Sequence, residues 1–467
     1  MQKIILFELN EVPLRIMDYY RKMRPNSWIA RNFAHFRKYE TYSENGGHLS
    51  PWNTWPTLHR GVSNHKHFIT DFNQDLNEVD REFPPVWKIL SENKVKTGVF
   101  GSLHSYPLPA NHEDYAFYVP DVFAAGSECF PKSVELFQDI NLKLSRKSAR
   151  NVDSSIPYKD ALTLLAKAPS LGFKFSTMLD VAKQLADEKM DSWKTVRRRT
   201  YQTVISFDVF MKLLKTEKPD FTTFFTNHVA SSQHRYWAAL FPDEYENLAY
   251  DDEWISTYNN EILFTMDKTD QMLKQLGKFI DSHPEYQLVV TSSMGQDANE
   301  CELLETQLYI VDHDKFFETL GFSNSEFEFL PSMLPQFNYS VSNPERFKAA
   351  LDSLVIDGGP VSYRELGNDR FSVDMGQNNV KDTTVMVGDK KMTVEDLGME
   401  NVIIEDKSNA TAYHVPEGSL YIYDPAGTHS EQADTSVPTC EILPNIMKNY
   451  GLKPSGYMAD TKTSIFN

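Results

Sequence analysis

A threonine hydroxyl at position 54 is the side chain whose surroundings best fit chemistry. Thr54 lies in residues 50–69, where a polar loop runs into a Trp-Pro step and then a segment of helix length that ends at Gly61. We expect Pro56 to mark the start of a helix, because the missing N–H of a proline costs nothing among the unpaired first four. Thr54 would then lie at a helix N-terminus, which favours an anion. The alternative is an N-capping threonine in an ordinary loop.

Groups that could assist Thr54 lie close to it in the sequence. A threonine hydroxyl is a weak nucleophile until a base or a metal ion lowers its pKa. Arg60 or Lys66 could hold the oxygens of an anionic substrate, and His67 could bind the same substrate. The histidines that could act as the base are His48, His59, His65 and His67.

The stretch around Thr54 resembles the nucleophile motif of the alkaline phosphatase superfamily, in its nucleotide pyrophosphatase/phosphodiesterase branch. That motif is Thr-(aromatic)-Pro, then a Thr-Gly-like turn, then His-Gly-(Ile/Val). This chain has Thr54-Trp-Pro, then Gly61, then His67-Phe68-Ile, so Phe68 replaces the usual glycine. The resemblance implies that Thr54 is the nucleophile of a phosphoryl- or sulfuryl-transfer enzyme.

Three further segments resemble the family in the same order along the chain. An apolar strand candidate opens the sequence, His414-Val-Pro-Glu-Gly resembles the family's late His-x-x-x-Gly, and residues 438–452 resemble its closing Pro-Thr-(helix)-Gly-Leu segment. The resemblance therefore spans nearly the whole chain. It implies an α/β fold, a three-layer sandwich with a mostly parallel central sheet.

Members of this family bind two metal ions, and the resemblance indicates that the first site is degenerate here. Asn10 stands at the place of the early aspartate ligand, and Ser293 and Met294 stand at the places of an aspartate and a histidine. A hydroxyl and a thioether do not neutralise a dication, so we expect no metal ion there. Asn10 and Ser293 remain as groups that could hydrogen-bond a substrate oxygen.

The second metal site of the family keeps more of its pattern. His234 and His414 match its two histidines, but its aspartate would fall at Ala230, which has no ligand atom. Asn227 or His228 could replace that aspartate if the loop is longer. Three imidazoles with an open fourth position are an arrangement that catalytic zinc favours. We predict at most one Zn²⁺ or other divalent transition metal ion, bound through His228, His234 and His414. The alternative is a set of hydrogen-bonding remnants of a lost site.

The strands and helices that must position these residues alternate along the chain. Strand-like runs at residues 95–100, 220–225 and 286–291 each follow a helical stretch, and another run lies at residues 4–9. This alternation favours a mostly parallel sheet with helices on both faces, in which ligands bind at the carboxyl ends of the strands. The residues that we expect to converge there are Asn10, Thr54, His228, His234, Ser293 and His414.

The chain divides into three parts of different character. Residues 1–310 are predicted to form the alkaline phosphatase-like α/β core, with a helical insertion at about residues 103–200. Repeated turn signals between short strand candidates predict a small α+β cap at residues 311–405. Residues 406–467 complete the core.

Composition and charge exclude several classes of protein. The 467 residues, 41% hydrophobic and 13% aromatic, are enough to bury a large core. A net charge of −18 argues against a nucleic-acid partner. We see no membrane span or secretory signal, and three scattered cysteines have no disulfide or metal spacing, so we expect a cytoplasmic protein.

Three functions remain open. The first is a phosphoryl- or sulfuryl-ester hydrolase or transferase that uses Thr54 with at most one metal ion. The second is a catalytically degenerate relative that binds a ligand or a partner protein. The third is a transferase acting on a glycan or lipid-linked phosphate intermediate. A small anionic compound bearing phosphate or sulfate is the expected substrate, and the sequence does not predict the oligomeric state.

Overall fold

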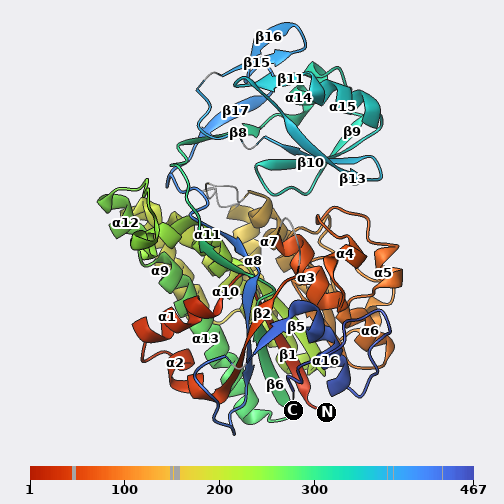
Figure 1. Cartoon of the computed structure of the whole chain (residues 1–467), viewed down its shortest axis with the longest axis vertical. Coiled ribbons are helices and arrows are strands. Elements are labelled where there is room, and N and C mark those ends of the chain that lie inside the picture. The colour runs from red at the N-terminus through yellow and green to blue at the C-terminus, as the bar shows by residue number, and fades with distance from the viewer. Residues whose placement is uncertain are drawn as a thin grey trace.

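A computed structural model of the chain describes residues 1–44, 49–147, 151, 158–375, 377–381, 383–433 and 435–466. A large α/β core carries a smaller lobe of short sheets (Figure 1). The core contains an eight-stranded sheet in the order β20-β2-β19-β6-β1-β5-β3-β4. Its strands are β1 (Lys3–Leu9), β2 (Phe36–Tyr42), β3 (Thr97–Phe100), β4 (Phe117–Val119), β5 (Phe221–Thr226), β6 (Tyr286–Thr291), β19 (Glu417–Tyr423) and β20 (Ser436–Pro438).

The central strand β1 pairs in parallel with both of its neighbours. Ile4 lies opposite Phe221 of β5 and opposite Gln287 of β6. Strand β19 runs antiparallel to β2 and β6, and the other described pairings of this sheet are parallel. The predicted mostly parallel sheet, with residues 4–9, 220–226 and 286–291 in it, is therefore confirmed.

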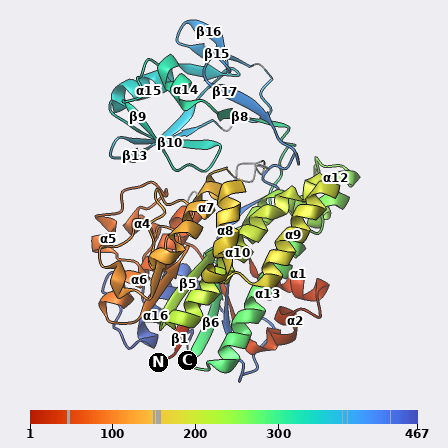
Figure 2. The ribbon, with the colours of Figure 1, turned by 180° about the vertical axis from the view of Figure 1, so that it is seen from behind.

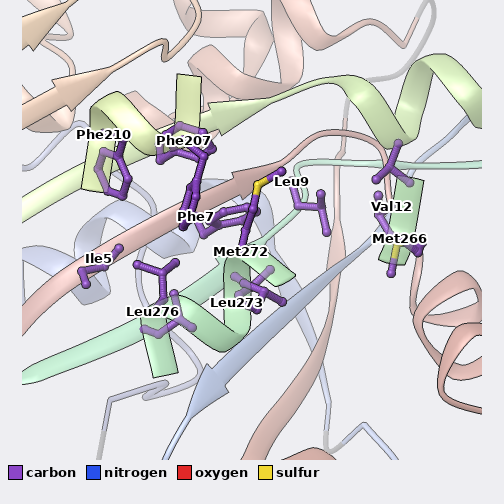
Figure 3. Packing of buried hydrophobic residues seen from close by; sticks show 14 of the residues in the cluster. Ile5, Phe7, Leu9, Val12, Phe207, Phe210, Met266, Met272, Leu273 and Leu276 are labelled. Carbon is purple, nitrogen blue, oxygen red and sulfur yellow. The ribbon is translucent and has the colours of Figure 1, made fainter. Parts of the chain in front are cut away.

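Alternate residues of β1 pack under helices on opposite faces of the sheet. Ile5 and Phe7 belong to one hydrophobic cluster, and Ile4 and Leu6 belong to the other. Figure 3 shows Phe7 beside Phe207, Phe210 and Met272. Because β1 is apolar on both faces, it is buried on both, as parallel strands usually are. The first face is covered by α1 (Leu14–Met23), α2 (Trp28–Asn32), α10 (Arg198–Glu217), α11 (His228–Leu240) and α13 (Glu261–Ser282), and the second by α3 (Pro51–Arg60), α6 (Val86–Glu92) and α16 (Ile442–Asn449).

Further helices surround these layers. Figure 2, the view from behind, shows α8 and α9 on the side of α10 and α13. Across the described ranges, none of the helices is long and apolar enough to span a membrane. These further helices are α4 (Asn64–His67), α5 (Val79–Glu82), α7 (Glu135–Lys147), α8 (Tyr158–Leu171), α9 (Phe175–Met190) and α12 (Asp252–Tyr258). The range predicted as a helical insertion, residues 103–200, contains α7, α8 and α9 together with β4.

The smaller lobe, called here the cap lobe, runs from residue 306 to residue 403. Its apolar side chains form a third hydrophobic cluster of their own. The chain enters through β8 and leaves through β17, which pair antiparallel with Thr306 opposite Ile403. We retain the three-part division with boundaries at residues 310 and 405 as a proposal. The elements of the lobe are β8 (Thr306–Ile310), α14 (His313–Thr319), β9 (Phe327–Leu330), β10 (Gln336–Val341), α15 (Pro344–Asp352), β11 (Leu354–Ile356), β12 (Gly359–Pro360), β13 (Ser362–Gly367), β14 (Arg370–Asp374), β15 (Thr384–Val387), β16 (Lys390–Thr393) and β17 (Met399–Ile403).

Polar contacts join the cap lobe to the core segment 71–75. Arg364 Nη2 donates to Asp71 Oδ2 at 3.0 Å, and Arg370 Nη1 donates to the carbonyl oxygen of Asn73 at 2.8 Å. Phe72 of this segment packs against Trp52 of α3, with ring centres 4.7 Å apart. The lobe is therefore held next to the helix that carries Thr54.

Candidate functional site

Polar residues follow the three central strands of the sheet at the same edge. Asn10 comes directly after β1, Asn227 after β5, and Ser292 after β6. Because these strands are parallel, their carboxyl ends meet at one edge, where open α/β sheets bind ligands. A two-stranded sheet of β7 (Gly295–Ala298) and β18 (Ala412–Val415) adds to this edge and places His414 opposite Gln296.

Glu11, His234 and His414 form a group of side chains that could hold a metal ion, called here the Glu11 cluster. Glu11 Oε2 lies 2.9 Å from His234 Nε2 and 3.3 Å from His414 Nε2. One ligand atom from each residue lies within 4.8 Å of the other two. Glu11 is 2% exposed, whereas the His234 side chain is 24% exposed. The cluster is therefore reached from solvent on the side of His234.

The far nitrogen of each imidazole is fixed by a backbone carbonyl. His234 Nδ1 lies 2.8 Å from the oxygen of Ala412, and His414 Nδ1 lies 2.8 Å from the oxygen of Leu49. A carbonyl oxygen only accepts, so each Nδ1 carries the hydrogen. In a neutral imidazole the Nε2 atom then has a free lone pair. Metal-binding histidines are usually held by such a bond at the other ring nitrogen.

The two Nε2 atoms and the carboxylate oxygen thus turn lone pairs toward one another. Positive charge between these three atoms would offset their repulsion. Burial alone would raise the pKa of Glu11, but the charges of His414 and His234 hold that pKa well below its usual value. Burial would lower the pKa of His414, and Glu11 raises it overall. A divalent cation between these three atoms would supply such positive charge.

Two glutamine amides complete the surroundings of Glu11. Gln233 Nε2 donates to the Glu11 carbonyl oxygen at 3.0 Å, and Gln296 Nε2 donates to Glu11 Oε2 and, at 3.2 Å, to the carbonyl oxygen of Ala230. The amide oxygens of Gln233 and Gln296 are buried without a hydrogen-bond partner in the part of the chain that the structure describes. Three ligand atoms that converge, with both imidazoles fixed at their far nitrogens, fit a metal ion.

An exposed aromatic ring borders the cluster. Tyr413 is 43% exposed, and its ring centre lies 4.4 Å from that of His414 and 6.0 Å from that of His234. Sequence reasoning did not single out Tyr413, although it directly precedes the predicted ligand His414. Its position makes one wall of the approach to the imidazoles.

The helix that carries Thr54 begins earlier than predicted. Helix α3 starts at Pro51 after an N-cap at Ser50, whose side chain accepts from the N–H of Trp52, and Pro56 lies inside it. The prediction of a helix start at Pro56 is wrong because Ser50-Pro51 is itself a strong start signal, with a capping residue followed by proline at the first position. The predicted end at Gly61 is confirmed, with φ of 66°.

Thr54 therefore lies within the first turn of α3 and has no exposed surface. Its hydroxyl donates to the carbonyl oxygen of Ser50 at 3.1 Å and lies 2.8 Å from Ser293 Oγ. The structure thus brings the predicted residues Thr54 and Ser293 into direct contact. The backbone N–H of Thr54 is already bonded to Ser50 and is not free to bind an anion.

Asn10 lies between helix α3 and the Glu11 cluster. Its Oδ1 accepts from Trp55 Nε1 at 2.6 Å. Its Nδ2 donates to Glu11 Oε1 at 2.8 Å and to Asn227 Oδ1 at 2.7 Å. Asn10 is 2% exposed, and its amide makes its hydrogen bonds to other residues of the protein. Its predicted role as a direct substrate contact is replaced by a contact with Glu11.

Comparison with known proteins gives structural neighbours only. No family model and no curated protein matches the chain. Murine ectonucleotide pyrophosphatase/phosphodiesterase 5 matches at 8% identity with a TM-score of 0.41, and 98% of each chain is covered. Phosphonoacetate hydrolase from Sinorhizobium meliloti, in complex with phosphonoacetate, matches at 13% identity with a TM-score of 0.42, covering 95% of this chain and 94% of that chain.

Both neighbours match along nearly the whole of this chain.

The predicted metal ligand His228 lies outside the Glu11 cluster. Its Nδ1 contacts Thr226 Oγ1, and its Nε2 lies 3.0 Å from Thr269 Oγ1. Burial lowers the pKa of His228 to about 4, so it stays neutral near pH 7. Both of its nitrogens are occupied, and Glu11 takes the place that we predicted for it. The candidate ligand set is therefore Glu11, His234 and His414 in place of the predicted set with His228.

Arg60 and His67 do not face the cluster either. Arg60 is fully buried, where it donates to the carbonyl oxygen of Phe83 at 2.5 Å and pairs with Asp80 at 2.7 Å. His67 Nδ1 accepts from the N–H of Ile69, and burial, with the nearby Arg60 charge, lowers the pKa of His67 to about 3. The predicted roles of Arg60 and His67 in binding substrate are therefore replaced by structural ones.

The remaining candidate bases are also accounted for. His59 Nε2 lies 2.7 Å from Glu8 Oε1 in the core, and His65 is exposed on α4. His48 lies outside the described residues. The side chains that the structure does bring to the edge of the sheet are Asn10, Glu11, Thr54, His234, Ser293 and His414.

Proposed function

We propose that this chain binds one divalent transition metal ion through Glu11, His234 and His414 and acts there on a phosphate- or sulfate-bearing ester, as a hydrolase or a transferase. The observation that carries the proposal is the convergence of three acceptor atoms whose imidazoles are fixed by backbone carbonyls. One carboxylate and two imidazoles with an open position are a ligand set found in zinc hydrolases. When bound, such an ion supplies positive charge that offsets charge developing on the substrate's oxygens.

The side chains of the site have separate roles in this proposal. His234 and His414 hold their Nε2 atoms toward Glu11, because the carbonyl oxygens of Ala412 and Leu49 fix the rings. Preorganised donors and charges of this kind need no rearrangement during the reaction. The exposed edge of His234 is the side from which the ester approaches.

We retain Thr54 as the proposed nucleophile. Its hydroxyl lies at the same edge of the sheet, against Ser293 Oγ, and the next residue, Trp55, contacts Asn10 beside Glu11. Because Thr54 has no exposed surface, its attack on an ester requires neighbouring side chains to move away. A hydroxyl that donates to Ser50 must also give up that bond before it loses its proton.

The metal site is tested by titrating zinc into protein freed of metal by a chelator. We expect one Zn²⁺ per chain in the wild type. His234→Ala and His414→Ala should each weaken binding by about 100-fold or more, since each removes one of three protein ligands. Equilibrium dialysis with elemental analysis measures both quantities.

His65→Ala provides the matched control for this titration, because His65 is an exposed histidine on α4 outside the cluster. It should bind zinc as the wild type does. Two Zn²⁺ per chain, or unchanged binding in both cluster variants, would contradict the proposed site.

Burial of Thr54 favours a second candidate function, that of a relative that binds an anionic ligand without turnover. Its hydroxyl is fully enclosed, and the matched positions Asn10 and Ser293 supply no carboxylate to activate it. In that case the Glu11 cluster would hold a metal ion that binds the ligand. Turnover in a Thr54 variant separates the two functions.

Thr54→Ala is expected to lower kcat by about 1,000-fold or more on bis(4-nitrophenyl) phosphate, 4-nitrophenyl phosphate or 4-nitrocatechol sulfate, whichever the zinc-loaded wild type turns over. Removal of a covalent nucleophile has effects of that order or larger. Zinc stoichiometry should stay unchanged, because Thr54 is not a ligand in the proposed site. Thr54→Ser keeps a hydroxyl and should retain part of the activity. Equal kcat in wild type and Thr54→Ala would remove Thr54 from the mechanism.

A further inference from the structure

We infer that Trp55 is a positioning residue for Glu11 and acts through the side-chain amide of Asn10. The inference rests on the metal site proposed above. It concerns a hydrogen-bonded relay of buried groups that starts on helix α3 and ends at the Glu11 cluster. Its first member, Trp55, directly follows Thr54 in the sequence.

The indole of Trp55 decides which way the Asn10 amide faces. Trp55 is fully buried, and its Nε1 lies 2.6 Å from Asn10 Oδ1. An indole N–H only donates, so the amide atom that faces it must be the oxygen. The amide nitrogen of Asn10 must then point the other way. One N–H group on α3 thus fixes an orientation that the Asn10 side chain alone leaves open.

The orientation of Asn10 in turn divides the two oxygens of Glu11 between different partners. Asn10 Nδ2 donates to Glu11 Oε1 at 2.8 Å, and its second hydrogen goes to Asn227 Oδ1 at 2.7 Å. Glu11 Oε2 faces His234 and His414 and also accepts from Gln296 Nε2. A carboxylate group rotates easily about its last torsion, so Asn10 at one oxygen and Gln296 at the other together decide which oxygen faces the imidazoles.

The backbone of Glu11 gives a second reason why this residue needs to be held. Its φ is 58°, in the left-handed region. That conformation is unfavourable for a residue with a side chain. Gln233 anchors the carbonyl oxygen of Glu11, and Asn10 and Gln296 anchor its carboxylate. Together these three amides keep a strained residue directed into the site.

The relay also joins the two parts of the proposed active site. Thr54 and Trp55 are adjacent in the first half of α3, so one short segment carries both the proposed nucleophile and the donor that orients Asn10. A shift of this segment would disturb the hydroxyl and the ligand Glu11 together. The helix therefore sets the alignment of one group with the other.

Trp55→Phe is the variant that separates positioning from packing. Phenylalanine keeps most of the ring, which packs 5.6 Å from those of His59 and Phe225, and removes the N–H group. Trp87→Phe is the matched control. Trp87 is buried in the same hydrophobic cluster, its ring lies 4.8 Å from that of His59, and it hydrogen-bonds Tyr118 instead of Asn10.

The experiment is a titration of Co²⁺ into metal-free full-length protein, followed by the visible absorption of the bound ion. We expect Trp55→Phe to bind Co²⁺ about 10-fold more weakly than the wild type and to change the absorption spectrum, as loss of a group that orients a ligand does in other metal sites. Trp87→Phe should bind within about twofold of the wild type, with the same spectrum. Thermal unfolding without metal compares the packing cost of the two variants.

Asn10→Leu adds a test that does not depend on the indole. Leucine has a similar shape and no donor, so we expect the same loss of Co²⁺ affinity. Because Trp55 acts through Asn10, the double variant Trp55→Phe with Asn10→Leu should lose little more Co²⁺ affinity than Asn10→Leu alone. Additive losses, or unchanged affinity and spectrum in Trp55→Phe, would overturn the inference. A wild type that binds no Co²⁺ would instead refute the proposed metal site itself.

Discussion

Replacing Glu11 by glutamine is expected to lower the affinity of the chain for Zn²⁺ by at least about 100-fold. Glu11 is the one anionic member of the cluster, and its Oε2 lies within 3.3 Å of both imidazole nitrogens. A glutamine is neutral and can present N–H groups to nitrogens that need a cation between them. The loss should therefore equal or exceed that of either histidine variant. Zinc titration of metal-free protein measures it.

Asp297→Asn is the control for the charge change. Asp297 is an exposed carboxylate on β7, next in sequence to Gln296, and it pairs with Arg15 outside the cluster. This variant should bind zinc as the wild type does. Equal zinc affinity in Glu11→Gln and wild type would show that the ion, if bound, lies elsewhere.

Replacing His59 by leucine is expected to destabilise the fold by about 3–5 kcal/mol. His59 Nε2 lies 2.7 Å from Glu8 Oε1, and Ser102 Oγ donates to Glu8 Oε2 at 2.8 Å. All three residues are almost completely buried. Removing one partner of such a pair leaves a polar group in the core without its bond, which is costly. Urea unfolding followed by circular dichroism gives the change in free energy.

The double variant Glu8→Leu with His59→Leu distinguishes this mechanism from simple loss of packing. Two apolar side chains of similar volume often replace a buried pair at little cost. We therefore expect the double variant to be more stable than His59→Leu alone. If the stability losses of Glu8→Leu and His59→Leu instead add in the double variant, the two residues are not coupled, and the expected mechanism is incorrect.

The fold was predictable because its main signal is local. Strands β1 and β6 are built around short apolar runs, and β5 consists of phenylalanine and threonine, residues that favour strands; each is buried on both faces. Gly61 ended α3 as predicted, since its left-handed φ suits glycine. The start of α3 was missed because two prolines, Pro51 and Pro56, offered competing start signals.

The site was predicted only in part, because spacing along a helix decides which side chains face each other. His228 and His234 are six residues apart in α11, and Thr54 and Arg60 are six apart in α3. At 3.6 residues per turn, such pairs lie about 120° apart around the axis and do not share a face. His228 and Arg60 accordingly point into other surroundings.

Glu11 was missed for a different reason. The family pattern directed attention to Ala230 as the lost carboxylate, whereas the structure supplies one from the residue after Asn10. A left-handed φ at Glu11 turns its side chain toward His234, and no spacing rule shows that turn. Its signal in the sequence was only a carboxylate beside a predicted site residue.

The pairing of β8 with β17 gives the cap lobe a narrow neck. Thr306 and Ile403 lie opposite each other, so the chain leaves the core and returns to it at points about 5 Å apart. An inserted segment whose two ends lie close together can be replaced, or change in length, without moving apart the core residues that it joins. The lobe stands beyond the edge of the sheet that carries Asn10 (Figure 1). Replacing this lobe would therefore change what reaches the proposed metal ligands while the strands that hold those residues stay unchanged.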